Sequence, residues 1–405
     1  MKALHASAGR RLPPAYVGAA FFARMAAEGA PVVIVLLALH RTGEAWLGGL
    51  LVAAATLPHV ITGPLAGRVR DRTGHPVAVT VAAALIVAAA LAALAGTTGV
   101  AAWPVVALFA VIAGTVEPLL LGGLSSLIGA LVPADRRHTA HAVDAATYNV
   151  AGIAGPAAGA AIATVASPAI ALVSLAAAAA LGAGFAAGLP RLPGPSAGAE
   201  SAGWADGFRW IWRTPILRTT TVVTTLAHGG LGGLAVVAPI LAVHLGASEN
   251  VGGLFISVFA AGAAAGSLAI SHPSARRLAP VPVVLTSLAV MAGGLALGAV
   301  ASSVAVAACG FAIAGLADGP LLTTTLHVRT MTSPAPVRTQ VFMVGASLKL
   351  TFSAVGAAAF GLLADVGGPT LLAVAAVVVV ASILPGLGAR NHAITDRRSH
   401  GRVTT

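Results

Sequence analysis

Four ionisable side chains each lie near the middle of a long apolar stretch of this sequence: Glu28, Glu117, His228 and Asp318. An isolated charge costs about 3 kcal/mol or more at the centre of a hydrocarbon layer, so charged residues are rare there without a specific role. Carboxyl and imidazole groups can take up and release protons. Glu117 has no partner along its own stretch, and its buried, protonated form would release a proton when water reached it. We interpret the four residues as candidates for proton exchange and ligand binding.

Each candidate also has a structural interpretation. Arg24 lies four residues before Glu28, so the two side chains share a helix face and could simply neutralise each other. Lys349, which lies in another apolar stretch, could be the structural counterion of Asp318. His228 is as compatible with a hydrogen-bonded packing role as with ligand binding. No group of His, Cys, Asp and Glu residues has the spacing of a metal site, so we expect no bound metal.

Twelve apolar stretches carry these residues. The chain is 58% hydrophobic and 9% charged, with a mean hydropathy of +0.93, whereas soluble domains are less apolar. The stretches are continuous and about 20 residues long, which suits bilayer-spanning helices and not the alternating strands of a membrane barrel. We predict an all-α integral membrane protein. Its predicted spans are 14–39, 45–66, 76–97, 102–132, 139–165, 168–189, 217–244, 250–271, 279–301, 303–328, 339–364 and 369–389.

The basic residues indicate how these spans are oriented. With a cytoplasmic N-terminus, the even-numbered connections and both tails hold twenty of the 23 Lys and Arg residues. Cytoplasmic segments of membrane proteins are enriched in basic residues in this way. We therefore predict a multi-pass protein of the cell (plasma or inner) membrane with both termini in the cytoplasm. The net charge of +11 is dispersed over these segments, so we expect no nucleic-acid partner.

An internal repeat divides the spans into two halves. A shift of 201 residues superimposes five pairs of residues without a gap. These pairs are Gly114 and Gly315, Glu117 and Asp318, Pro133 and Pro334, Arg137 and Arg338, and Gly155 and Gly356. We predict two pseudo-symmetric six-helix bundles with a binding path between them. The predicted segments are an N-terminal bundle (1–190), a cytoplasmic linker (191–216), a C-terminal bundle (217–389) and a basic cytoplasmic tail (390–405).

The linker contains one short amphipathic segment. Trp204, Phe208, Ile211 and Trp212 are spaced so that they share one face of a helix, with charged residues elsewhere. Such a helix suits the inner headgroup region of a membrane. We predict that it anchors the two halves there, and a regulatory role is the alternative.

Two motifs resemble signatures of one membrane-protein family. The stretch GRVRDRTGHP resembles that family's loop between helices 2 and 3, although its closing His-Pro replaces the usual basic pair. The stretch GIAGPAAGA in the fifth span resembles its Gly-Pro-x-x-Gly antiporter signature. The matching residues are Gly67, Asp71, Arg72 and Gly74 in the loop, and Gly155, Pro156 and Gly159 in the span. Over nearly its full length, the sequence resembles a twelve-helix major facilitator superfamily transporter of the drug and natural-product efflux type.

The resemblance implies roles for several residues. Helices 1, 4, 7 and 10 line the central cavity of such transporters, so the four intramembrane candidates are expected to face it. Asp71 is expected to contact the inner start of helix 11 near Arg338 and to latch the two halves in the outward-open state. Arg137 and Asp144 lie near the inner end of helix 5, where we expect a gate or a fold contact. His59 in helix 2 is compatible with either kind of role.

The function implied by the resemblance is secondary active export of a small amphiphilic compound, a drug or a natural product, by proton antiport and alternating access. Many proton-coupled members have an arginine in helix 4, where this chain has Glu117 followed by proline, which favours branches such as macrolide and siderophore exporters. The alternatives are proton-coupled uptake of a small nutrient, which the antiporter signature argues against, and a transport-inactive membrane sensor. The excess of acids over bases among the candidates favours a cationic or neutral lipophilic substrate.

Other function classes lack a signature in this chain. The sequence contains no nucleotide-binding P-loop, and no Gly-x-Ser-x-Gly follows a predicted strand as a nucleophile elbow requires, so we expect neither an enzyme nor an ATP-driven pump. The expected partners are a small-molecule substrate, protons and the lipid bilayer. We expect no cofactor, and we expect the protein to be a monomer.

Overall fold

The computed structural model describes residues 12–59, 61–63, 65, 75–133, 136–190, 192, 204–270 and 278–387. Within these residues, twelve helices are long and apolar enough to cross a membrane, in agreement with the twelve predicted spans. The first six spans contain α1 (Pro14–Thr42), α2 (Ala45–Thr56), α4 (Pro76–Thr97), α5 (Trp103–Leu131), α6 (Arg137–Val165) and α7 (Pro168–Ala187).

The second six spans follow a short helix, α8 (Trp204–Arg213). They contain α9 (Pro215–Leu231), α10 (Leu234–His244), α11 (Val251–Ile270), α12 (Pro280–Ala299), α13 (Val304–Thr332), α14 (Ala335–Leu362) and α15 (Gly368–Ala381). Helices α9 and α10 form a single span, Pro215–His244, that is interrupted at two glycines. A 3-10 turn, Ala364–Val366, precedes α15.

Proline and serine mark where these helices begin. Pro14, Pro76 and Pro168 stand at the starts of α1, α4 and α7, where the missing backbone N–H of proline costs nothing. At the start of α7 the backbone N–H of Ile170 also donates a hydrogen bond to Ser167 Oγ, at 3.2 Å. These local signals explain why the starts of these helices match the predicted span boundaries so closely.

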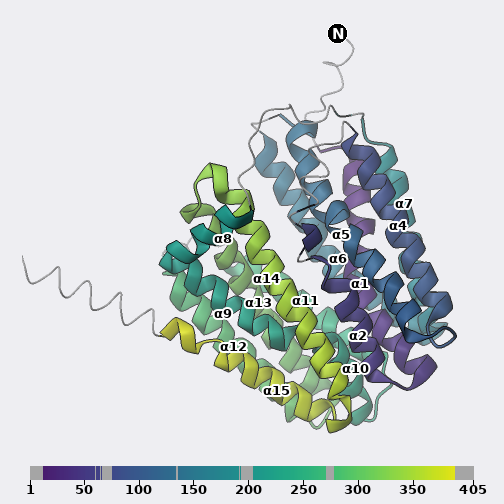
Figure 1. Ribbon diagram of the computed structural model, residues 1–405. Helices are drawn as coiled ribbons and strands as arrows, with labels where there is room; N and C mark the ends of the chain where they lie inside the picture. The colour runs from purple at the N-terminus through teal and green to yellow at the C-terminus, as the bar shows by residue number, and fades with distance from the viewer. Residues whose placement is uncertain are drawn as a thin grey trace, which may run out of the picture.

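The helices form two bundles, which lie beside each other in Figure 1. In the N-terminal bundle α1 packs against α6 and α7, and α4 packs against α5 and α7. In the C-terminal bundle α13 packs against α11 and α12, and α14 and α15 both pack against α9. The bundles contact each other mainly through α2 with α14 and through α6 with α11. The structure therefore confirms two six-helix bundles in an all-helical membrane fold.

Glycines related by the repeat occupy equivalent helix crossings. A Cβ atom on Gly114 of α5 would overlap the carbonyl oxygen of Ala55 in α2. A Cβ atom on Gly315 of α13 would overlap the carbonyl oxygen of Phe259 in α11. Both glycines allow two backbones to approach closely, which is the main source of helix association in lipid. The pseudo-symmetry therefore extends from the sequence pattern to the packing.

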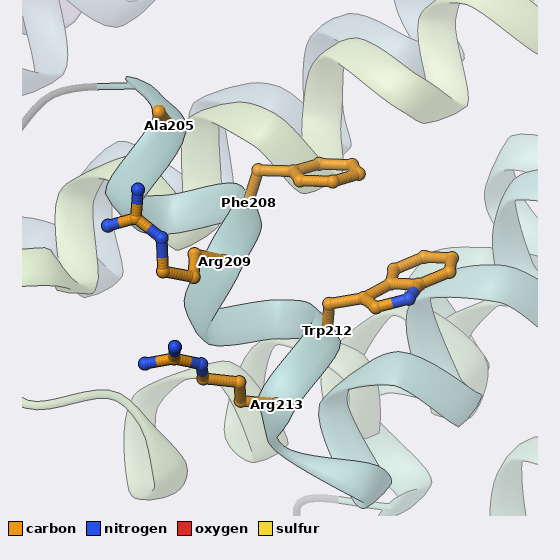
Figure 2. A pocket seen from close by; sticks show the side chains of 5 residues that line it. All are labelled: Ala205, Phe208, Arg209, Trp212 and Arg213. Atoms are coloured by element: carbon orange, nitrogen blue, oxygen red, sulfur yellow. The ribbon is translucent and has the colours of Figure 1, made fainter.

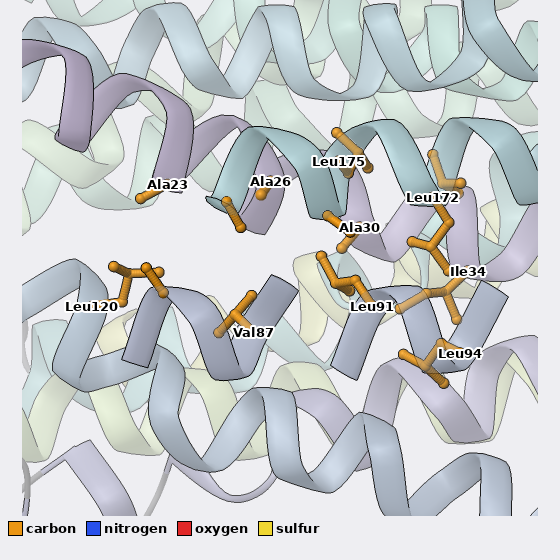
Figure 3. Close-up of a cluster of buried hydrophobic side chains, with 14 of the residues drawn as sticks. Ala23, Ala26, Ala30, Ile34, Val87, Leu91, Leu94, Leu120, Leu172 and Leu175 are labelled. Atoms are coloured by element: carbon orange, nitrogen blue, oxygen red, sulfur yellow. The ribbon is translucent and has the colours of Figure 1, made fainter. Parts of the chain in front are cut away.

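The core of the N-terminal bundle consists of small and branched side chains, as Figure 3 shows. Lipid tails are as apolar as these residues, so close packing and not the hydrophobic effect holds the helices together. The labelled residues come from α1 (Ala23, Ala26, Ala30 and Ile34), α4 (Val87, Leu91 and Leu94), α5 (Leu120) and α7 (Leu172 and Leu175).

The closest backbone contacts between the two bundles lie at the end of the molecule away from α8, and nearer α8 a Cβ atom on Gly63 would be 3.6 Å from Met343 Cε of α14. Gly49 of α2 lies so close to Gly361 of α14 that a Cβ atom on Gly49 would be 2.8 Å from its Cα atom. Gly253 at the start of α11 faces the carbonyl oxygen of Pro156 in α6, and Val236 of α10 belongs to the core of the N-terminal bundle. We call the end of the molecule that carries α8 the α8 side (Figure 1).

Helix α8 is docked on the C-terminal bundle, and this corrects one prediction. Ile211, predicted to face the membrane with the aromatic residues, is buried against α9, α13 and α14. Trp210 Nε1 donates a hydrogen bond to the carbonyl oxygen of Thr332, at 3.0 Å. Phe208 and Trp212 remain exposed and stack on each other with ring centroids 5.6 Å apart. The exposed face is therefore narrower than the predicted one, because the short helix has to contact the bundle on its other side.

Figure 2 shows how the side chains of α8 are distributed. Phe208 and Trp212 point to one side of the helix, and Arg209 and Arg213 point to another. Together with Ala205 these four residues line a surface pocket that belongs to this single helix. The pocket contains none of the predicted intramembrane candidates, so we do not interpret it as the transport site.

Candidate functional site

The N-terminal bundle contains a buried and well-paired arginine. Arg24 Nη2 forms an ion pair with Asp144 Oδ1 at 2.7 Å, and Arg24 is fully buried. Tyr16 and Ser125 donate hydrogen bonds to the same carboxylate, at 2.6 and 2.8 Å. The guanidinium also lies over the ring of Tyr148, 3.4 Å from its centroid. This network joins α1, α5 and α6 within one bundle, so its geometry is that of a fold contact.

The network changes the interpretation of two candidates. The ion pair of Arg24 is with Asp144 and not with Glu28, which the sequence had allowed. Asp144 contacts Arg24 of α1 in its own bundle, which is the arrangement expected of a fold contact, one of the two predicted alternatives. Glu28 is left without an ion pair among the described residues.

Two acids and a histidine lie close together in the same bundle. Glu28 is exposed although it lies midway along α1, and it is within electrostatic range of Glu117 on α5. Glu117 Oε2 is 3.6 Å from His59 Nε2, and both side chains are partly buried. The proximity to Glu117 places Glu28 on the interior side of α1. We call Glu28, His59 and Glu117 the acidic cluster.

The candidates of the C-terminal bundle are close together but make few direct contacts. Asp318 of α13 and Lys349 of α14 are within electrostatic range, yet within the described part of the chain they form no ion pair at 4.0 Å or less. His228 Nδ1 lies 2.7 Å from the carbonyl oxygen of Thr224, one turn earlier in α9. That carbonyl can only accept, so Nδ1–H donates and Nε2 is the ring atom left for another partner.

Sequence reasoning missed Arg329. It was counted among the cytoplasmic basic residues after a span ending at 328, but α13 continues to Thr332 and Arg329 is only 3% exposed. Its guanidinium fits where a Cβ atom on Gly345 of α14 would stand. Arg329 follows Asp318 by eleven residues, which is close to three full helical turns, so both residues lie on the same face of α13. This spacing was the signal that could have revealed it.

The Gly-Pro-x-x-Gly motif lies on α6 between the two bundles. A Cβ atom on Gly155 would be 2.7 Å from the carbonyl oxygen of Met25 in α1. One on Gly159 would be 2.6 Å from Val33 Cγ2, also in α1. On the opposite side, the carbonyl oxygen of Pro156 faces Gly253 of α11. The motif therefore joins α1 of its own bundle to the partner bundle through close backbone contacts.

The remaining predicted gating residues are not tested by the structure. The loop residues Gly67, Asp71, Arg72 and Gly74 lie outside the described residues. Arg137 and Arg338 lie in α6 and α14, and their side chains lie outside the described part as well. The contact of the loop with the start of helix 11 therefore stays a prediction.

Comparison with known proteins agrees with this architecture. Residues 16–229, more than half of the chain, match the sequence model of the Major Facilitator Superfamily. An uncharacterized MFS-type transporter, y4rN of Sinorhizobium fredii, is 29% identical over 260 residues. That alignment covers 63% of this chain and 64% of the relative, which is just under two thirds of the relative's length.

Several solved structures have the same fold. The nucleoside transporter NupG superimposes with a TM-score of 0.76 at 12% identity, covering 92% of this chain and 98% of that one. An inward-facing, unoccupied bacterial homologue of the human lysosomal transporter Spinster superimposes with a TM-score of 0.72 at 16% identity. The superposition covers 94% of this chain and 96% of that one. A POT family transporter in complex with a thioalcohol-conjugated peptide superimposes with a TM-score of 0.71 at 13% identity. The superposition covers 93% of this chain and 96% of that one.

Proposed function

Because this chain belongs to the major facilitator superfamily, we propose that it is a secondary active transporter that exports a small amphiphilic compound, a drug or a natural product, in exchange for protons. The observation that carries this proposal is the acidic cluster: two carboxyl groups and an imidazole from three helices lie together inside the membrane-spanning region, and the neighbouring Arg24 is already ion-paired with Asp144. Such groups are expensive inside a bilayer and typical of proton relays in transporters.

The acids supply a mechanism for coupling. In the proposed cycle, Glu28 and Glu117 bind protons when the path is open to one side of the membrane and release them when it is open to the other. Asp318, the repeat-related counterpart of Glu117, contributes from the C-terminal bundle. Protonation competes with substrate binding, so that each substrate molecule leaves in exchange for protons. Alternating access follows if the two bundles rock about the contacts between them.

The packing of α6 supports the direction of transport. Its Gly-Pro-x-x-Gly motif, which resembles an antiporter signature, joins α1 to α11 with almost no space for a larger side chain. A tightly packed helix at this position would seal the path against a proton leak while the substrate site is empty. Since the structural neighbours include a nucleoside transporter and a POT family transporter in complex with a conjugated peptide, they do not indicate which compound this chain carries.

The proposal includes an orientation. The α8 side is cytoplasmic, since Arg209 and Arg213 lie there and the predicted connections on that side hold most of the basic residues. The functional segments are the two bundles 1–190 and 217–389, joined by the linker 191–216 and followed by a basic tail, 390–405. In this proposal the outer side is the end where α2 and α14 approach most closely, at Gly49 and Gly361.

Transport in inverted membrane vesicles tests the proposal. A panel of amphiphilic drugs and natural products is offered with and without an imposed proton gradient. We expect gradient-driven accumulation that is lost when Glu117→Gln and Asp318→Asn are combined. Glu44→Gln, which changes an exposed acid outside the spans, is the matched control and keeps full activity. Transport that ignores the gradient or survives the double substitution refutes proton coupling. Accumulation only in right-side-out vesicles identifies an uptake symporter, and no transport at all favours a sensor.

A further inference from the structure

Arg329 is a buried cation that the proposed transport cycle does not use. Within the described residues, its Nε and Nη2 atoms have no hydrogen-bond partner, and the nearby ring of Phe342 has its centroid 6.0 Å from the guanidinium carbon. An unpaired charge in such a place is costly, and a protein retains it only where it serves a purpose. Arg24 shows the contrast, because the N-terminal bundle supplies that arginine with a carboxylate.

Gly345 makes the space that Arg329 occupies. Any side chain at this position of α14 would overlap the guanidinium. The repeat relates Gly345 to Asp144 in the N-terminal bundle, the residue that pairs with Arg24. Each bundle therefore places an arginine at this point, although the two arginines come from different helices of the repeat. The C-terminal bundle has a glycine where the N-terminal bundle has the carboxylate, and the guanidinium itself fills the space of that side chain, so this position supplies Arg329 with no counterion.

A second cation lies one helical turn away. Lys349 follows Gly345 by four residues on the same face of α14, is 9% exposed and is within electrostatic range of Arg329. Within the described residues it makes no hydrogen bond or ion pair. The nearby Asp318 carboxylate is within electrostatic range of Lys349 but not in contact with it. Two cations against one distant carboxylate leave this region with an excess of positive charge.

We propose that Arg329 and Lys349 form an anion-binding subsite beside Gly345 for a carboxylate or phosphate group of the transported compound. The inference rests on the proposed transport function and makes it more specific: the substrate is an amphiphile with an acidic group, and not the cationic or neutral compound that the sequence favours. A guanidinium binds such groups through two parallel hydrogen bonds, and the lysine ammonium adds a third donor group. Both side chains are buried in the bundle, which favours the transported compound over a lipid headgroup as the source of the anion.

The stability of the ligand-free protein provides the first test. Arg329→Met and Arg24→Met are compared by thermal unfolding in nanodiscs of phosphatidylcholine, without any added ligand. We expect Arg329→Met to unfold at the same temperature as the wild type or higher, because it removes an unpaired charge, and Arg24→Met to unfold at a lower temperature. If Arg329→Met is destabilised as strongly as Arg24→Met, the arginine has a structural role and the proposal is wrong.

Binding of a simple anion provides the second test. Sodium benzoate and its neutral analogue benzyl alcohol are titrated into the same nanodiscs while thermal unfolding is followed. We expect benzoate alone to raise the unfolding temperature, with a half-saturating concentration about tenfold or more higher in Arg329→Met and Lys349→Met. Arg329→Lys, which keeps the charge and loses the paired hydrogen bonds, is expected to retain part of the effect. Equal effects of the two compounds, or variants that respond like the wild type, overturn the proposal.

The source of the anion is tested in the same assay. Nanodiscs that contain phosphatidylglycerol replace those of phosphatidylcholine, with no benzoate present. Stabilisation that depends on Arg329 and is produced by phosphatidylglycerol but not by benzoate assigns the subsite to a lipid headgroup and overturns the substrate assignment. These measurements need no gradient, so a failure of proton coupling in the vesicle assay leaves them unaffected, and their failure leaves proton coupling intact.

Discussion

Replacing Gly155 by alanine tests whether the Gly-Pro-x-x-Gly motif acts through backbone contact. The new Cβ atom would lie 2.7 Å from the carbonyl oxygen of Met25 and 2.8 Å from the backbone nitrogen of Gly29. Both obstacles are backbone atoms of α1, so no side chain can rotate away and the two helices have to separate. Overpacking of this kind costs about 1–3 kcal/mol.

Gly152→Ala is the matched control on the same helix. Its nearest neighbour would be Ala260 Cβ at 4.0 Å, which is an ordinary contact. Both substitutions remove a helical glycine, which favours the folded state by about 0.5–1 kcal/mol. Since this gain is common to both variants, the difference between Gly155→Ala and Gly152→Ala isolates the overlap, and we expect the former to be less stable by about 1–3 kcal/mol.

Equilibrium unfolding in mixed detergent micelles measures this difference, and vesicle transport measures its consequence. We expect Gly155→Ala to lower both the free energy of unfolding and the transport rate, and Gly152→Ala to lower neither. Equal stability of the two variants, or a stabilised Gly155→Ala, refutes the interpretation that close approach of α1 and α6 at Gly155 explains the motif.

Three further predictions each concern one residue. Asp144→Asn leaves Arg24 buried without its counterion and is expected to lower the free energy of unfolding by about 3–5 kcal/mol; an additional Arg24→Met should recover part of the loss, and no recovery would contradict the pairing. Trp210→Phe removes the hydrogen bond to Thr332 and is expected to lower the free energy of unfolding by about 0.5–1.5 kcal/mol in the same assay. An unchanged free energy of unfolding would contradict the docking of α8 on the C-terminal bundle. Burial raises the pKa of Glu249 above its ordinary 4.5, so the folded state holds this proton more tightly than the unfolded chain. The contribution of this tightly held proton to the stability of the folded state is fully present below pH 4.5 and is lost as the pH rises through the raised pKa of Glu249. Thermal unfolding from pH 4 to 8 should therefore find Glu249→Gln more stable than the wild type at neutral pH only, and a pH-independent difference would contradict this.

The number of spans and the division into bundles could be predicted because they depend on local patterns. Apolar runs of bilayer length, prolines at helix starts and the 201-residue repeat can all be read directly from the sequence. The repeat even anticipated packing, since Gly114 and Gly315 stand at equivalent helix crossings. The loop residues such as Asp71 could be recognised by their motif, but their contacts stay a prediction.

The pairing of buried charges could not be predicted, because the partners come from different helices. Arg24 and Asp144 are 120 residues apart, and nothing in the sequence favours that partner over the nearby Glu28. Glu117 has no partner along its own helix, and the structure supplies His59 from another. Arg329 was misplaced for another reason. A residue near the end of a span looks like a loop residue until the length of the helix is known.

The central claim is that protons move in exchange for substrate through the acidic cluster. The most direct test uses purified protein in liposomes that enclose a pH-sensitive dye, with a compound from the vesicle panel supplied outside and no imposed pH gradient. We expect the lumen to become alkaline as the compound enters, and we expect no pH change when Glu28→Gln and Glu117→Gln are combined. Entry of the compound without a pH change, or with acidification of the lumen, would contradict proton antiport.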